Sequence, residues 1–162
     1  MIGNDVVDIV QSRKESNWQR RGFLDKIFTK EEQRIISSHH YPETMVWMLW
    51  SMKEAAYKIF NRQTGIRANI AKQLLCHINE LNTGTVTFKG NFYYCKTIVQ
   101  DNCIYTVAAC SKSSLESIYE LQNVTLIKDS NGLPYIANKP MGSLQPVSVS
   151  HHGNYYKIAT LL

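Results

Sequence analysis

The chain has 162 residues, and its hydrophobic content of 44% is enough for a single domain, residues 1–162, with a core of its own. It has no apolar run of the roughly 18 residues that a membrane-spanning helix needs, and Asp5 interrupts the stretch that would be apolar in a secretory signal, so we expect a cytoplasmic protein. The net charge of +5 favours an acidic partner, but no basic stripe with interleaved aromatics, as in a nucleic-acid reader, is present.

The first elements in chain order are a strand and two helices. A β-branched run predicts a strand over residues 2–10, and a short helix is expected around residues 16–25. Thr29 and Glu32 form a capping box, which predicts a helix that starts there and ends at about Ser38.

The longest helix comes next. The segment 39–42 contains Pro42 and ends the preceding helix, and a long helix is predicted from Glu43 to Gln63, with Gly65 as its terminator. A weaker helical pattern covers residues 68–81.

Beyond residue 82 the apolar pattern changes to that of strands. Residues 85–88, 92–99 and 104–110 predict an antiparallel meander. A further strand is expected through residues 126–128, followed by a strong turn at 129–132.

The chain ends in an expected hairpin over residues 146–153 and 155–162. Strand, helices and then mostly strands together predict an α+β domain, in which helices pack on one face of an antiparallel sheet. Four cysteines lie outside any C-x-x-C spacing and are expected to be reduced, structural thiols: Cys76, Cys95, Cys103 and Cys110.

Asp5 and Glu54 are the first candidates for a site, because each lies in an apolar segment. Asp5 sits in the first predicted strand and Glu54 in a helix that is apolar on nearly every side. An ionised carboxylate in such a place costs several kcal/mol unless it is paired or coordinated. Two of them suggest a divalent metal, and a metal held by two carboxylates keeps positions open for phosphate oxygens, as Mg²⁺ does.

Cations lie next to Glu54 on the same helix. Lys58 follows it by four residues, so the two project from one side, and Lys53 lies one step round. An ordinary surface pair of Glu54 and Lys58, worth about 0.3 to 0.5 kcal/mol, is the alternative, but the apolar residues on the other faces leave little exposed surface. Asp8 faces away from Asp5 on a strand and is expected to cap a turn or meet a basic surface.

The third candidate is the segment Ser148-Val149-Ser150-His151. Its hydroxyls and imidazole suit contacts with phosphate or ribose better than nucleophilic attack, because neither serine lies in a nucleophile elbow. Alone, this short pattern is more often structural.

Taken together and in order, these segments resemble the 4'-phosphopantetheinyl transferases, with the motif order of the holo-acyl-carrier-protein synthases. The strongest motif is Trp-x-x-Lys-Glu-Ala-x-x-Lys at residues 50–58. The others are Gly3-Asn4-Asp5 with the residues that follow, Phe28-Thr29-Lys30-Glu31-Glu32, Asn131-Gly132-Leu133-Pro134 and the Ser-His segment.

The resemblance implies that the chain transfers phosphopantetheine from coenzyme A to a serine of an apo acyl or peptidyl carrier protein, with Mg²⁺ as cofactor. It implies that Asp5 and Glu54 hold the metal and that Lys58 meets the phosphates of coenzyme A. Lys53, Lys58, Ser150 and His151 are then the expected contacts to coenzyme A, and Asp5, Glu54 and Lys58 the expected catalytic residues.

The chain also departs from that family's short synthases. The strands over residues 84–110 look more like the closing sheet of the larger, surfactin-synthetase-type transferases, Val7 replaces their third acid, and His152 stands where many members have Ser. The short synthases are trimers with sites between subunits and the larger ones are monomers. We expect a homotrimer that completes the site, with a monomer as the alternative.

The expected partner is an acidic carrier protein of fatty-acid, polyketide or peptide synthesis. Arg20, Arg21 and Lys26 are the candidates for docking it. Two other classes of protein stay open: a module of the same fold that binds a carrier protein without catalysis, and a basic domain that binds nucleic acid.

Overall fold

A computed structural model describes residues 1–80, 82–138 and 142–161. Along these residues the elements follow in this order: β1 (Ile2–Asp8), α1 (Ile9–Glu15), α2 (Phe23–Ile27), α3 (Lys30–Ser38), α4 (Pro42–Thr64), the 3-10 turn η1 (Ala71–Gln73), β2 (Leu75–Ile78), β3 (Thr83–Phe88), β4 (Asn91–Gln100), β5 (Cys103–Ala109), α5 (Lys112–Glu116), β6 (Ile118–Leu121), β7 (Ile127–Lys128), β8 (Pro134–Asn138), β9 (Ser143–His152) and β10 (Tyr155–Leu161).

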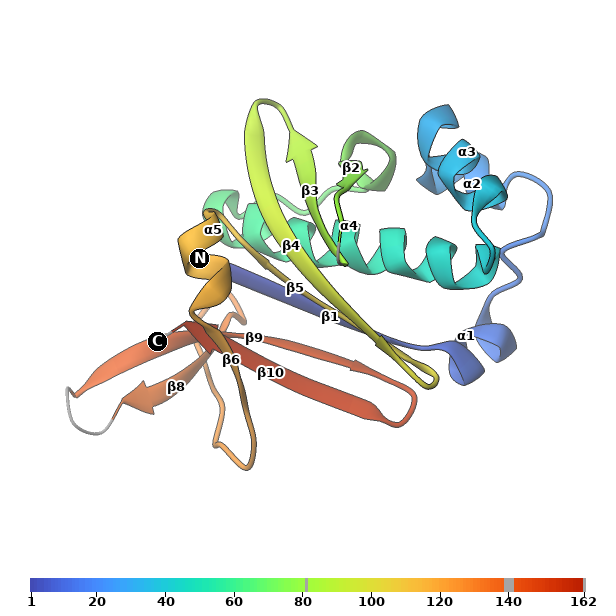
Figure 1. Ribbon diagram of the computed structural model, residues 1–162. Helices are drawn as coiled ribbons and strands as arrows, with labels where there is room; N and C mark the ends of the chain where they lie inside the picture. Colours follow the sequence, from blue (N-terminus) through green and yellow to red (C-terminus); the bar gives the residue numbers. More distant parts are fainter. Residues whose placement is uncertain (81, 139–141, 162) are drawn as a thin grey trace.

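The strands form two antiparallel sheets. The first has the order β1-β5-β4-β3-β2 and the second the order β6-β10-β9-β8-β7. Figure 1 shows α4 along one face of the first sheet and the second sheet, in orange and red, beyond β1. The predicted α+β class with antiparallel sheets is confirmed, although two sheets are present where one was expected.

The start of the chain differs from the prediction over residues 2–25. β1 ends at Asp8 because the Asp8 carboxylate accepts hydrogen bonds from the N–H groups of Val10 and Gln11, and so caps α1. The expected helix over residues 16–25 is replaced by α1 before it and the short α2 at its end.

The two predicted helix signals around α3 and α4 are confirmed. Thr29 and Glu32 exchange both hydrogen bonds of the capping box at the start of α3. α4 has Pro42 in its first turn and ends at Gly65, whose φ of 70° is the left-handed conformation that glycine adopts without strain.

The helix predicted over residues 68–81 is wrong within the described residues. The chain forms only the turn η1 there and then enters β2, which pairs with β3 as the edge of the first sheet. Residue 81 itself lies outside the described residues. A strand of this kind depends on its partner, which the periodicity of the segment does not reveal.

The strands after residue 82 agree with the prediction. β3, β4 and β5 form the expected meander, and the turn before β8 has Gly132 at a φ of 78°. Ser111 caps α5, and β6 precedes the short β7. The closing hairpin is β9 and β10; Leu162, its predicted last residue, lies outside the described residues.

The core lies between α4 and the first sheet. Gly3 lets β1 approach the helix closely, since a Cβ atom there would lie 1.9 Å from the carbonyl oxygen of Ala55. This approach brings the middle of β1 beside the middle of α4. The four cysteines are free thiols, and Cys110 is exposed rather than packed. Within the described parts of the chain, no helix is long and apolar enough to cross a membrane.

Candidate active site

A cavity of about 330 Å³ lies where β1, α4 and the end of β9 meet. Asp5 from β1 and Glu54 from α4 both line it, together with Trp50, His151 and His152. Phe23 and Ile27 of α2 belong to its apolar wall. The cavity therefore combines three acids, the third being Glu15 of α1, with two imidazoles and an apolar side, and all of these groups come from one chain.

Asp5 is held in place by one oxygen of its carboxylate. Oδ1 accepts a hydrogen bond of 3.1 Å from the Ser150 hydroxyl and lies 3.7 Å from Nζ of Lys58. Oδ2 is buried without a hydrogen-bond partner. Burial raises the pKa of Asp5 to about 6, although the charge of Lys58 and the hydrogen bond from Ser150 oppose this rise.

Glu54 shows the same perturbation more strongly. Its pKa is raised to about 7, first by burial and then by the negative charge of Asp5, while Lys58 acts in the opposite direction. The two acids therefore destabilise each other's charged form, and Lys58 compensates them only in part.

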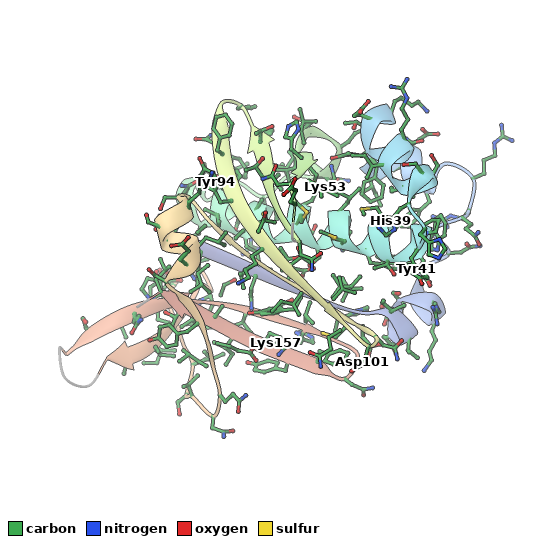
Figure 2. The ribbon with its side chains drawn as sticks, in the orientation of Figure 1. His39, Tyr41, Lys53, Tyr94, Asp101 and Lys157 are labelled. Atoms are coloured by element: carbon green, nitrogen blue, oxygen red, sulfur yellow. The ribbon has the colours of Figure 1, made fainter. Side chains whose placement is uncertain are left out.

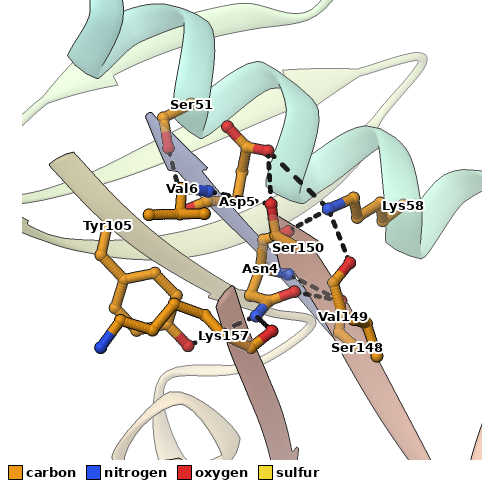
Figure 3. Close-up of polar contacts among 10 residues, drawn as sticks. All are labelled: Asn4, Asp5, Val6, Ser51, Lys58, Tyr105, Ser148, Val149, Ser150 and Lys157. Carbon is orange, nitrogen blue, oxygen red and sulfur yellow. Dashed lines mark hydrogen bonds and ion pairs between the residues drawn. The ribbon is translucent and has the colours of Figure 1, made fainter. Parts of the chain in front are cut away.

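Lys58 links Asp5 of β1 to the second sheet (Figure 3). Its Nζ donates to the carbonyl oxygens of Asn4 at 2.6 Å and Val149 at 3.1 Å. Among the ion pairs of the described residues, Lys58 pairs with Asp5 rather than with Glu54, so the ordinary surface pair of Glu54 and Lys58 is not formed. Burial lowers the pKa of Lys58, and the two acids partly offset this effect.

Lys53 is not part of this cavity, which corrects its assignment as a contact to coenzyme A. Its side chain is 0% exposed, and Nζ lies 2.8 Å from Oε1 of Glu32. It also donates to the carbonyl oxygens of Ala71 and Leu74. Figure 2 shows Lys53 on the side of α4 away from the second sheet. With its hydrogen bonds made inside the protein, it cannot reach a ligand.

The residues of the Ser-His segment divide into two groups. Ser150 is 6% exposed, and its hydroxyl accepts from the N–H of Val6 and donates to Asp5, so it does not face a nucleotide as expected. His151 is exposed and lines the cavity, where a ligand can reach it. Asp8 caps α1 and accepts from the N–H of Asn154, in agreement with the expectation that it caps a turn.

Sequence reasoning missed several residues around the acids. Asn4 is fully buried and bonded to Ser148, and His152 contacts both the N–H of Asp8 and the carboxylate of Glu15. The alternation of Ser148, Ser150 and His152 along one strand was the available signal, because alternate residues share one face.

The acids fit a hard divalent cation. Within the described residues no group of three or more Asp, Glu, His or Cys side chains is placed to hold a metal. Asp5 and Glu54 line the same cavity and are two carboxylates that could hold one there. Carboxylate oxygens are the ligands that Mg²⁺ prefers, and it commonly uses one or two of them with water and substrate phosphates. The buried, unpartnered Oδ2 of Asp5 is what such an ion would satisfy.

Residues 1–111 match the sequence model of the 4'-phosphopantetheinyl transferase superfamily. No curated protein matches the chain.

Three solved structures share the fold. The holo-[acyl-carrier-protein] synthase of Neisseria meningitidis has a TM-score of 0.56 at 17% identity, over 68% of this chain and 97% of that one. The structure of the Helicobacter pylori synthase in complex with coenzyme A has a TM-score of 0.53 at 17% identity, and the match covers 68% of this chain and 100% of that one. The Thermotoga maritima synthase has a TM-score of 0.52 at 12% identity, and the match covers 99% of this chain and 83% of that one.

Proposed function

Since this chain belongs to the 4'-phosphopantetheinyl transferase superfamily, we propose that it transfers the phosphopantetheine group of coenzyme A to a serine of an apo acyl or peptidyl carrier protein. Adenosine 3',5'-bisphosphate is the product released. The observation that supports this most is the incompletely compensated pair of Asp5 and Glu54 at one cavity, with Lys58 beside them.

Asp5 and Glu54 would hold Mg²⁺, which when bound neutralises the charge on a pyrophosphate. In the transfer, the serine oxygen forms a bond to phosphorus, the bond from that phosphorus to the leaving phosphate breaks, and the serine loses its proton. Glu54 and His151 could accept this proton, and Glu15 and His152 are further candidates at the same cavity. Lys58 supplies the positive charge nearest the acids, which suits the leaving phosphate.

The direct test mixes the chain with apo acyl carrier protein, coenzyme A and Mg²⁺. Mass spectrometry should show the carrier gaining one phosphopantetheine group, and adenosine 3',5'-bisphosphate should appear in equal amount. Asp5→Asn and Glu54→Gln should each lower kcat/KM by about a thousandfold or more, on the order of 4 kcal/mol, because each removes a metal ligand. The exposed Glu116→Gln is the matched control and should keep full activity.

Normal rates in both cavity variants would contradict the proposal. Carrier binding without any transfer by the wild-type chain would favour the non-catalytic module instead.

The partner and the assembly belong to the same proposal. An acidic carrier would dock near Arg20, Arg21 and Lys26, which are exposed beside the α2 wall of the cavity. Fatty-acid, polyketide and peptide carriers are the candidates for the acceptor. The homotrimer stays a prediction that light scattering during gel filtration can test. A second copy is not needed to bring His151 to the acids, since one chain already does so.

A further inference from the structure

The outer edge of β1 is covered by side chains rather than by another strand. β1 pairs with β5 on one side only, at the edge of the first sheet. On its other side, the N–H of Asn4 donates to the hydroxyl of Ser148 at 2.9 Å, and that of Val6 to the hydroxyl of Ser150 at 3.0 Å. The N–H of Asp8 donates to Nδ1 of His152 at 2.9 Å. We call Ser148, Ser150 and His152 the edge row; it satisfies donors that an edge strand otherwise leaves free.

Each member of the edge row accepts a hydrogen bond from a backbone N–H of β1. Its own hydroxyl or ring N–H is therefore directed to a second partner. Figure 3 shows this for the two serines. The hydroxyl of Ser148 donates to Oδ1 of Asn4 at 2.8 Å, and that of Ser150 to Oδ1 of Asp5 at 3.1 Å. Nε2 of His152 lies 3.0 Å from the carboxylate of Glu15. Within the edge row, Ser150 is therefore the residue that both accepts from β1 and donates a hydrogen bond to a candidate metal ligand, Asp5.

The consequence for Asp5 is an unequal pair of oxygens. Oδ1 is occupied by the Ser150 proton and by the nearby ammonium of Lys58. Oδ2 is left buried and without a partner. A carboxylate free to rotate would exchange the two oxygens, whereas the hydrogen bond from Ser150 holds one orientation.

We propose that Ser150 is a positioning residue that orients the Asp5 carboxylate for its metal, with Oδ2 presented to the ion. This inference rests on the proposed function, because it needs Asp5 to be a metal ligand. It assigns Ser150 a role through Asp5 rather than a contact to coenzyme A. Partners that orient a ligating side chain in this way are typically worth 10- to 100-fold in metal affinity.

The edge row contains its own control. Ser148 lies on the same strand and covers the same edge, and it is as buried as Ser150, at 5% against 6% exposed. Its proton goes to the amide of Asn4 instead of a carboxylate. Replacing either serine by alanine thus removes one acceptor from β1, but only Ser150→Ala releases Asp5.

The experiment measures Mn²⁺ binding by electron paramagnetic resonance on the full chain with coenzyme A present, and unfolding temperature alongside. Ser150→Ala should weaken Mn²⁺ binding by about 10- to 100-fold, and Ser148→Ala by no more than about twofold. Both variants should lose similar thermal stability. In turnover, the Mg²⁺ concentration for half-maximal rate should rise for Ser150→Ala, while KM for the carrier stays the same.

Unchanged metal affinity in Ser150→Ala, or equal weakening in Ser148→Ala, would overturn the positioning role and leave the proposed function intact. If Ser150→Ala does not fold, Ser150→Cys keeps the shape with a weaker donor and should still weaken Mn²⁺ binding at least severalfold; unchanged binding there would overturn the role too. A wild-type chain that neither binds Mn²⁺ nor modifies a carrier would overturn both the proposed function and this inference.

Discussion

Lys53 and Glu54 are neighbours on α4, yet one belongs to a buried ion pair and the other to a cluster that faces a cavity. In the buried pair every charged oxygen has a partner. Glu32 accepts from Lys53 and from the N–H groups of Thr29 and Cys76, and Lys53 donates in addition to two carbonyl oxygens. In the cavity cluster, Asp5 and Glu54 share one lysine, and Oδ2 of Asp5 has no partner.

Under the proposed function, the difference separates charges that hold the fold from charges available to a ligand. Glu32 and Lys53 tie α3 and α4 to the segment before β2, with their desolvation offset by hydrogen bonds. Burial instead raises the pKa values of Asp5 and Glu54, because their charged forms are poorly compensated. A bound divalent cation would stabilise these charged forms. Changes on the two sides of α4 should therefore act in opposite directions on stability.

The largest expected effect is on the buried pair. Lys53→Met should lower the free energy of unfolding by about 3 to 5 kcal/mol, because it leaves the Glu32 carboxylate buried without a cation. Urea denaturation followed by circular dichroism measures this. Lys30→Met is the matched control: it breaks an ion pair with Asp25 whose side chains are 78% and 58% exposed, and should cost under about 1 kcal/mol. Equal losses in the two variants would mean that the buried pair has no special structural role.

The next effect has the opposite sign and depends on pH. The folded pKa of Glu54, about 7, lies above its ordinary value of 4.5, so the folded state holds the proton more tightly. The contribution of Glu54 to the free energy of unfolding is therefore fully present below pH 4.5 and is lost as the pH rises to about 7. With metal removed by EDTA, Glu54→Gln should therefore be about 1 to 2 kcal/mol more stable than wild type at pH 8, after allowance for partial exposure.

Denaturation curves at pH 4 and pH 8 check this prediction. The advantage of Glu54→Gln should shrink toward zero at pH 4, where wild-type Glu54 is protonated, and Glu116→Gln should show no such trend. A Glu54→Gln chain that is less stable than wild type at pH 8 would contradict the view that Glu54 is poorly compensated.

The sequence was sufficient where the structural signal is local. The capping box of Thr29 and Glu32, the long α4 with Gly65 at its end, and the β3–β5 meander all follow from short-range patterns. The pattern was insufficient at β2, which depends on pairing with β3. The early end of β1 was also missed, although Asp8 is a good helix-capping residue, because the β-branched run continues beyond it.

The same division holds for the site. Asp5 and Glu54 were found because an acid in an apolar segment needs an explanation, and the structure places both at one cavity. Lys53 was misassigned, since helical periodicity places it one step from Glu54 but does not reveal that Glu32 lies on that side. The covering of the β1 edge by Ser148 and Ser150 joins residues about 144 positions apart, which no local pattern shows.

A smaller effect is expected from a third set of charges, the exposed cations beside the cavity. Arg20→Glu with Arg21→Glu should raise KM for an acidic carrier by about tenfold, close to 1.4 kcal/mol, with kcat nearly unchanged. The increase should fade in high salt, where the Debye length falls to about 3 Å at 1 M. Lys89→Glu with Lys128→Glu makes the same change of charge at exposed positions elsewhere and should have little effect. Equal effects of the two double variants would indicate a general charge effect rather than a docking surface.

The central claim, that Asp5 and Glu54 are kept uncompensated to hold a metal for coenzyme A, is tested most directly by calorimetry. Coenzyme A is titrated into the wild-type chain and into Glu54→Gln, each with Mg²⁺ and with EDTA. Mg²⁺ should tighten binding to the wild type at least about tenfold, on the order of 1.4 kcal/mol, and should not tighten binding to Glu54→Gln. Equal affinities with and without Mg²⁺ in the wild type would contradict the claim.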